Sequence, residues 1–177
     1  MTRLDSGAEA PDFTLVDQDE QPVTLSGLRG DSVILFFYPE AMTPGCTTEA
    51  CDFRDSLSPL QAAGYKVFGV SRDLPEKLRQ FRARDSLTYD LLSDPEREVH
   101  EAYGVWGEKT RNGATAMGVI RSTFVIDGQG RILHALYDVQ PEGHVARLKE
   151  TLRIGVRRHS PVSQDRARSR DPRVTIP

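Results

Sequence analysis

The 177-residue sequence has no run of about eighteen apolar residues, the length that a membrane-spanning helix needs, so no such helix is predicted. Segment 1–7 lacks the apolar stretch of a secretory signal, and we therefore expect the chain in the cytoplasm. The four histidines are scattered, and the two cysteines do not form a C-x-x-C pair. We therefore expect neither a zinc site nor any other metal or cofactor.

The sequence also lacks a large excess of charge of either sign. The net charge of −3 combines −7 over residues 1–154 with +4 over an arginine-rich stretch from residue 155 onward. An acidic body argues against nucleic acid as the main partner. The composition predicts one folded domain over residues 1–154. Residues 155–177 are polar and nearly free of large apolar side chains, which predicts a basic, disordered tail.

The two cysteines follow a strongly apolar run. Residues 33–38 are β-branched, aliphatic and aromatic, a composition that predicts a buried strand. After Pro44 apolar residues recur at spacings of three and four, with Thr43 as the expected N-cap and Pro44 at the first helical position. Cys46 therefore falls in the first turn of a helix. Free N–H groups and the helix dipole there favour a thiolate, the nucleophilic form of cysteine.

The spacing of the two cysteines leaves two interpretations open. A free cysteine is usually buried and inert, but the position of Cys46 favours a reactive thiol. Cys51 lies five residues further on, which separates the Cα atoms by roughly 8–9 Å on an ideal helix. A disulfide requires Cα atoms within about 7 Å. The chain therefore carries either two unrelated thiols or a redox switch that unwinds its own helix.

The rest of the chain alternates between strand and helix patterns. Strands are predicted at 66–71 and 89–92, and hairpins at 13–25 and 121–137. Helices are predicted at 44–63 with a break near Pro59, at 75–85, at 96–103 after an Asp94 N-cap, and from Pro141 to 152. Residues 108–118 are expected to form a long loop. This order indicates an α/β fold, with a mixed sheet covered on both faces.

The pattern Pro39-x-x-x-Thr43-x-x-Cys46 resembles the peroxidatic motif of the peroxiredoxins. The whole stretch 39–51, with its second cysteine five positions on, is similar to the bacterioferritin comigratory protein / peroxiredoxin Q branch. The resemblance runs from about residue 7 to residue 154. It implies a thioredoxin-like fold, in which helices flank a mixed central sheet that carries an N-terminal hairpin extension.

The resemblance also implies roles for individual residues. Thr43 orients the peroxide and Pro39 shields the thiolate, although from the residues alone Thr43 is a plain N-cap and Pro39 a strand terminator. Arg121 lies beside the sulfur and Glu49 orients that arginine. Without the resemblance, an arginine at a strand end is a weak signal, and Glu49 is an acid favoured by the helix dipole.

The implied reaction is reduction of hydrogen peroxide and organic hydroperoxides by the Cys46 thiolate. Cys51 then resolves the sulfenic acid as a 46–51 disulfide after local unfolding, and thioredoxin or a similar dithiol restores the thiols. We expect a monomer without a nucleic-acid or membrane partner. Two alternatives remain: a thiol–disulfide oxidoreductase, which normally shows the absent C-x-x-C, and a peroxide-sensing redox switch without efficient turnover.

Overall fold

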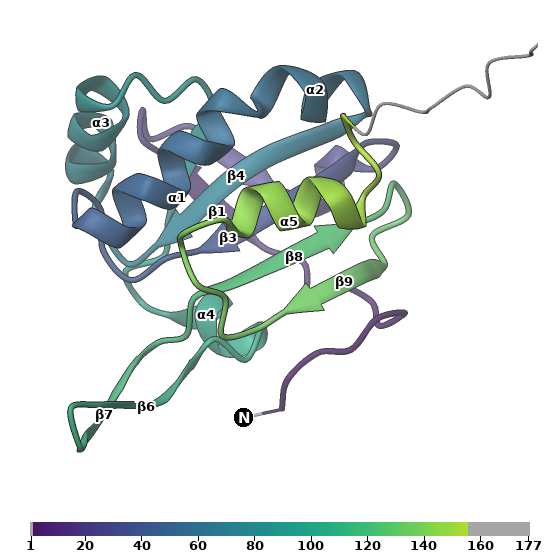
Figure 1. The fold of residues 1–177 in the computed structure, drawn as a ribbon. Helices are drawn as coiled ribbons and strands as arrows, with labels where there is room; N and C mark the ends of the chain where they lie inside the picture. The colour runs from purple at the N-terminus through teal and green to yellow at the C-terminus, as the bar shows by residue number, and fades with distance from the viewer. Residues whose placement is uncertain (1, 156–177) are drawn as a thin grey trace, which may run out of the picture.

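The structure is a computed structural model that describes residues 2–155 and has a mixed sheet at its centre (Figure 1). In spatial order the seven strands are β2 (Pro22–Thr24), β1 (Thr14–Asp17), β5 (Asp90–Ser93), β4 (Tyr65–Ser71), β3 (Ser32–Phe37), β8 (Ser122–Ile126) and β9 (Ile132–Leu136). Strand β4 is parallel to both β3 and β5, and the other neighbouring pairs are antiparallel. The basic, disordered tail predicted over 155–177 lies outside the described residues, apart from Gly155.

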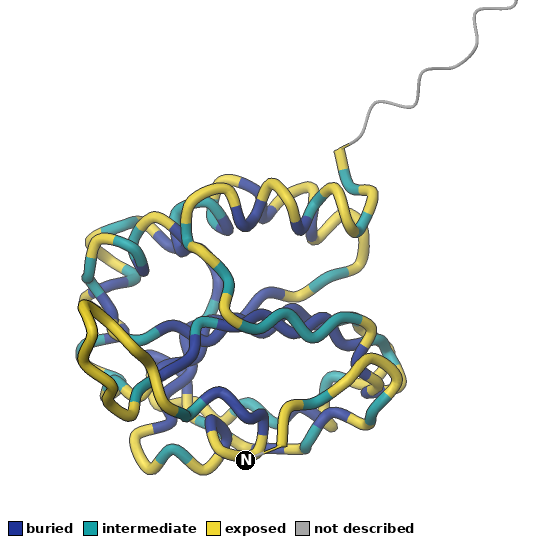
Figure 2. The backbone as a smooth tube through the Cα atoms, turned by 60° about the horizontal axis from the view of Figure 1, so that its bottom comes forward, coloured by how far each residue is buried: buried dark blue, intermediate teal, exposed yellow. Residues whose placement is uncertain are grey.

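Helices cover both faces of the sheet. Four of them share a buried cluster on one face: α1 (Pro44–Asp55), α2 (Leu57–Ala62), α3 (Pro75–Arg84) and α5 (His144–Thr151). The other face is covered by α4 (Glu98–Ala102), the short 3₁₀ helix η1 (Leu25–Leu28) and the N-terminal segment. Figure 2 shows the result as a buried central layer with exposed outer helix faces. The predicted mixed sheet flanked by helices is therefore confirmed.

Strand β3 shows why the apolar run has no polar interruption. Ile34 and Phe36 belong to the buried cluster under α1, whereas Leu35 and Phe37 belong to the cluster on the opposite face. A strand that is covered on both faces needs apolar residues at every position, not at alternate ones. Local composition therefore specified a central strand that is buried on both faces.

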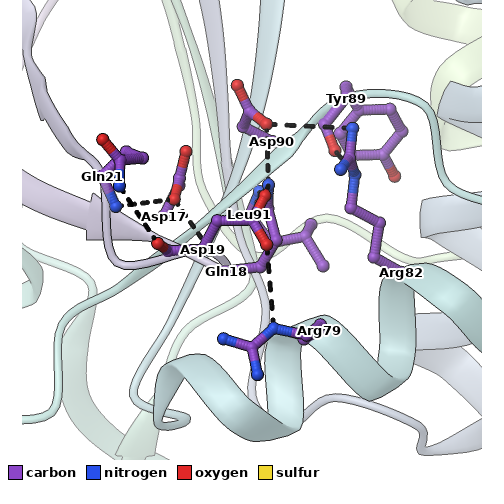
Figure 3. A network of polar contacts seen from close by, with 9 residues as sticks. All are labelled: Asp17, Gln18, Asp19, Gln21, Arg79, Arg82, Tyr89, Asp90 and Leu91. Atoms are coloured by element: carbon purple, nitrogen blue, oxygen red, sulfur yellow. Dashed lines mark hydrogen bonds and ion pairs between the residues drawn. The ribbon is translucent and has the colours of Figure 1, made fainter.

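The predicted N-terminal hairpin is present as β1 and β2, and its turn is attached to the edge of the sheet (Figure 3). Gln18 is 1% exposed; its Oε1 accepts a hydrogen bond from the Leu91 N–H at 3.0 Å, and its Nε2 donates to Asp90 Oδ1 at 3.0 Å. Arg79 of α3 lies 3.7 Å from Asp19 of the same turn. These contacts connect the hairpin to both β5 and α3.

The prediction of a long loop at 108–118 was wrong. Residues Trp106–Arg111 and Ala114–Val119 form a second, two-stranded antiparallel sheet, β6 and β7, which projects from the body in Figure 1. Asn112 and Gly113 both have positive φ, 52° and 77°, as a type I′ hairpin turn requires. The Asn-Gly pair was the available signal, but the exposed, polar strands show no apolar alternation.

The fourth helix is shorter than predicted because its N-cap residue is Arg97 and not Asp94. The Asp94 carboxylate instead accepts a hydrogen bond from the His100 N–H at 2.9 Å and contacts His100 Nδ1 at 2.6 Å. Helix α4 begins only at Glu98, after Arg97 in a left-handed conformation with φ of 61°. The carboxylate therefore holds the chain around the helix start.

Two further helix boundaries differ from the prediction. The cysteine helix breaks at Ser56, and Pro59 lies inside the first turn of the following α2. An N–H group in a first turn has no acceptor within its helix, so proline loses no helical hydrogen bond there. The last helix, α5, starts at His144 and not at Pro141, after Gly143 with φ of 74°. Both helices still place their apolar residues against the sheet.

The sheet order brings three chain segments to one edge. Phe37 at the end of β3 pairs with Val70 near the end of β4 and with Ser122 at the start of β8. The loop that leads from β3 to α1, the segment after β4 and the residue before β8 therefore meet there. Over residues 2–155, no helix combines the length and hydropathy that a membrane crossing requires.

Candidate active site

The thiol of Cys46 lies at this edge, in the first turn of α1. Thr43 has the extended backbone of an N-cap, with φ of −85° and ψ of 156°, and Pro44 is the first helical residue. The first helical hydrogen bond runs from the Thr47 N–H to the Thr43 carbonyl at 2.9 Å. The N–H groups of Gly45 and Cys46 precede that bond, so no helical carbonyl accepts them. Cys46 itself is 1% exposed.

A guanidinium group contacts the sulfur from the other side. Arg121 precedes β8; its Nη2 donates to Cys46 Sγ at 3.4 Å and its Nη1 donates to Glu49 Oε1 at 3.0 Å. Burial acts to lower the pKa of Arg121, but the negative charges of Glu49 and Cys46 outweigh it, so the pKa is raised. A permanent cation is therefore placed against the sulfur, and it can donate to atoms that bond to the sulfur.

Gly45 leaves space for the Arg121 guanidinium beside the helix start, a role that was not predicted from the sequence. A Cβ atom at this position would lie 3.4 Å from Arg121 Nη2 and 3.3 Å from Pro141 Cγ. Any larger side chain would push the guanidinium or the segment before α5 away from the helix start. The signal in the sequence was the glycine itself, directly before the cysteine in a helix.

Glu49 is fully buried one turn further along α1. Its Oε1 accepts from Arg121, whereas its Oε2 has no hydrogen-bond partner. Burial raises the pKa of Glu49 to about 7, and the charge of Arg121 opposes part of that rise. The carboxyl group therefore titrates near neutral pH, and its ionised form balances the charge of Arg121.

The Thr43 side chain does not cap the helix, in contrast to the prediction. Its hydroxyl donates to the Glu40 carbonyl at 2.7 Å, within the loop between β3 and α1. That bond uses the hydroxyl proton and leaves the lone pairs of Oγ1 available to accept a hydrogen bond. Pro39 is half-buried at the start of the same loop.

Cys51 lies in the same helix as Cys46, and both thiols are free. Helix α1 is continuous from Pro44 to Asp55, so both cysteines are in regular helix. Burial raises the pKa of the Cys51 thiol, which disfavours its thiolate while the helix is intact. The structure therefore represents a dithiol state with the two sulfurs kept apart by regular helix.

Neither of two large surface hollows contains the site. One of about 580 Å³ lies between β2, β4 and β5, and one of about 540 Å³ lies between β9 and α5; Cys46 and Arg121 line neither. Within residues 2–155 there is no group of three or more histidine, cysteine, aspartate or glutamate side chains suited to a metal ion.

Known proteins share this fold and sequence. The AhpC/TSA family profile matches residues 6–135. A putative peroxiredoxin of Mycobacterium tuberculosis (strain ATCC 25618 / H37Rv) is 54% identical, over 86% of this chain and 98% of the relative. Peroxiredoxin Bcp of Escherichia coli (strain K12) is 45% identical, over 81% of this chain and 92% of that protein.

Solved structures agree with the sequence comparison. Xanthomonas campestris bacterioferritin comigratory protein, studied for its alkyl peroxide reduction activity, superposes with a TM-score of 0.78 at 32% identity, covering 84% of this chain and 98% of that one. Peroxidoxin BcpB of Mycobacterium tuberculosis gives a TM-score of 0.73 at 38% identity, with 84% and 96% coverage. The chain therefore belongs to the AhpC/TSA family, as a peroxiredoxin of the bacterioferritin comigratory protein / peroxiredoxin Q branch.

Proposed function

We propose that the chain is a thiol peroxidase whose nucleophile is Cys46. The sulfur attacks the terminal oxygen of a hydroperoxide, and the O–O bond breaks. The sulfur becomes a sulfenic acid, and the other oxygen leaves as an alcohol or as water after it takes up a proton. The observation that carries this proposal is the Arg121 guanidinium 3.4 Å from a sulfur in the first turn of a helix.

The neighbouring groups are assigned to the charge that develops in this step. Arg121 and the free N–H groups of the helix start donate to the peroxide oxygens, as in oxyanion stabilisation. Thr43 Oγ1 accepts a hydrogen bond from the O–H group of the hydroperoxide, because its own proton is donated to the Glu40 carbonyl. Pro39 limits the access of water, and Glu49 holds the orientation of Arg121 through their 3.0 Å contact.

Cys51 is assigned to the second step. Its thiol attacks the sulfenic sulfur of Cys46, so a disulfide forms and water is released. A bridge between residues five apart cannot form on regular helix, where the Cα atoms are roughly 8–9 Å apart. The first turns of α1 must therefore unwind before the disulfide closes.

The kind of reductant is assigned from this chemistry. A dithiol protein such as thioredoxin supplies two electrons and two protons, and it leaves as its own disulfide. The substrates are hydrogen peroxide and organic hydroperoxides. The cytoplasmic location and the monomeric state remain predictions.

The test is a steady-state assay with hydrogen peroxide, thioredoxin and thioredoxin reductase. Turnover should be lost in Cys46→Ser, whereas Cys51→Ser should still form the sulfenic acid once per chain. Full activity of Cys46→Ser would show that the nucleophile is assigned wrongly. Disulfide formation without turnover would favour a peroxide-sensing switch, and reduction of insulin without peroxide would favour a thiol–disulfide oxidoreductase.

A further inference from the structure

A polar cluster outside the assigned site holds the active-site loop from the side of β4 and α3. The Asp73 Oδ2 atom accepts hydrogen bonds from the Ala41 N–H and from Ser71 Oγ, each at 2.8 Å. Lys77 Nζ lies 3.3 Å from Asp73 Oδ1 and donates to Glu40 Oε1 at 2.6 Å. Two consecutive loop residues are therefore attached to one carboxylate–ammonium pair.

Asp73 is itself fixed firmly enough to act as an anchor. Its backbone N–H donates to Ser71 Oγ at 3.2 Å, and its carbonyl accepts from Ser93 Oγ at 2.6 Å. Both serines are buried at the ends of β4 and β5, and the Asp73 side chain is only 10% exposed. The carboxylate therefore transmits the position of the central sheet to the loop.

The loop that it holds is short and conformationally unfavourable. Only Met42 and Thr43 separate Ala41 from the first residue of α1. Met42 has a φ of 66°, a left-handed conformation that few residues other than glycine adopt. Such a conformation persists only where surrounding contacts enforce it. The bond from Ala41 to Asp73 lies directly before this residue.

We propose that Asp73 and Lys77 are positioning residues. They stabilise the observed conformation of this loop, in which α1 is intact, against the unwound one. They hold Thr43 and the start of α1 where Cys46 reacts with peroxide, and they oppose the unwinding through which Cys51 reaches Cys46. A contact made in only one of two conformations shifts the equilibrium toward it by its own free energy. Breaking the contact should therefore slow sulfenic acid formation and accelerate disulfide formation. This inference rests on the proposed function.

The test measures the two steps separately. In a Cys51→Ser background, dimedone trapping with rapid quenching and mass spectrometry gives the rate at which peroxide forms the Cys46 sulfenic acid. With Cys51 present and peroxide in excess, quench-flow with thiol alkylation gives the rate of disulfide closure. Asp73→Asn should slow the first step about tenfold and speed the second by a similar factor, the effect of one hydrogen bond to a charged group.

Lys77→Met provides a second variant at a half-exposed position. It keeps the Asp73–Ala41 bond but removes the attachment of Glu40, so about threefold changes in the same opposite directions are expected. The matched control is Lys66→Met, because Lys66 forms an exposed pair with Asp31 at 3.2 Å at the other end of β4. Both rates of that control should equal those of the parent.

Opposite changes in the two steps that are absent from the Lys66→Met control distinguish positioning of this loop from an effect of losing a salt bridge elsewhere on β4. If either folded variant shows equal changes in both steps, or none, the inference is wrong. If Asp73→Asn does not fold, Lys77→Met decides the question alone. A Cys51→Ser parent that peroxide does not sulfenylate overturns the proposed function as well.

Discussion

At the scale of single residues, the site depends on the two contacts of Arg121. One guanidinium nitrogen donates to the Cys46 sulfur and the other to Glu49, so the planar group is oriented by two partners at once. A lysine carries the same charge but presents one nitrogen on a flexible stem. Orientation and charge can therefore be separated by a single conservative substitution.

Arg121→Lys should lower the rate of Cys46 sulfenylation by about 100-fold or more, as the loss of an oriented donor to a developing charge does in other enzymes. Rapid-quench trapping of the sulfenic acid in a Cys51→Ser background measures this rate. Arg131→Lys is the matched control, since Arg131 is exposed beyond the far end of β8 and donates to the Gly7 carbonyl. A rate of Arg121→Lys within twofold of the parent would contradict the assigned role.

Glu49 should make the site pH-dependent near neutrality. Its pKa is raised to about 7 in the folded chain from a usual value of 4.5, so folding favours the protonated form. The associated stability is fully present below pH 4.5 and is lost as the pH rises through 7. Glu49→Gln removes this loss. As the pH rises from 5 to 8, the parent loses this stability and the variant does not. The difference between their free energies of unfolding should therefore shift in favour of the variant.

The same variant should react more slowly with peroxide at pH 8, because Arg121 loses the carboxylate that orients it. Urea unfolding at pH 5 and pH 8 measures the stability, and sulfenic acid trapping measures the rate. Opposite changes in stability and rate would indicate that a buried carboxylate is kept for function at a cost in stability. An unfolding profile of Glu49→Gln that runs parallel to the parent across this pH range would refute the prediction.

At the scale of elements, helix α1 has to be both ordered and able to open. Its start carries the thiol of Cys46, and its second turn is attached to the body by the Tyr89 hydroxyl, which donates to the Ala50 carbonyl at 2.7 Å. This bond lies directly before Cys51. The helix segment between the two cysteines is therefore held in place by a side chain from the chain segment that leads into β5.

Tyr89→Phe should accelerate disulfide closure after sulfenylation by about three- to tenfold, because one net hydrogen bond no longer opposes the unwinding of α1. Quench-flow alkylation with excess peroxide measures the closure rate. Tyr103→Phe is the control, because Tyr103 donates in the same way to the Pro11 carbonyl on the opposite face of the sheet. Equal effects of the two substitutions would show that the acceleration reflects general destabilisation.

At the scale of the whole molecule, the sheet order assembles the site. Because β4 is parallel to β3 and β8 is antiparallel to it, the ends of β3 and β4 and the start of β8 share one edge. Arg121, Asp73 and the loop before α1 all lie at that edge.

Because residues 155–177 are polar and nearly free of large apolar side chains, a chain that ends after Gly155 should keep its stability within about 0.5 kcal/mol, the usual limit for changes that remove no packed feature. Its peroxide turnover should equal that of the full chain. Urea unfolding and the thioredoxin-coupled assay measure the two quantities. A loss of either would assign the arginine-rich segment a structural or functional role and would contradict the predicted domain boundary.

The sequence by itself determined the elements whose signals are local. The uninterrupted apolar run specified β3, and the Thr-Pro pair specified where α1 begins, so Cys46 could be placed in the first helical turn. The hairpin of β8 and β9 was predicted from its Asp-Gly turn. The hairpin of β6 and β7 was missed, because exposed strands lack an apolar alternation and only Asn112-Gly113 indicated the turn.

Only the tertiary structure decided which distant residues meet. Arg121 lies 75 positions from Cys46, and its bare signal in the sequence was weak. Nothing local indicated that Asp73 would hold the Ala41 N–H, or that the Asp94 carboxylate would accept from the His100 N–H inside the first turn of α4. Spacing along the chain specifies the faces of a helix or strand, but contacts between elements depend on strand order and register, which arise when both faces of the sheet are buried together.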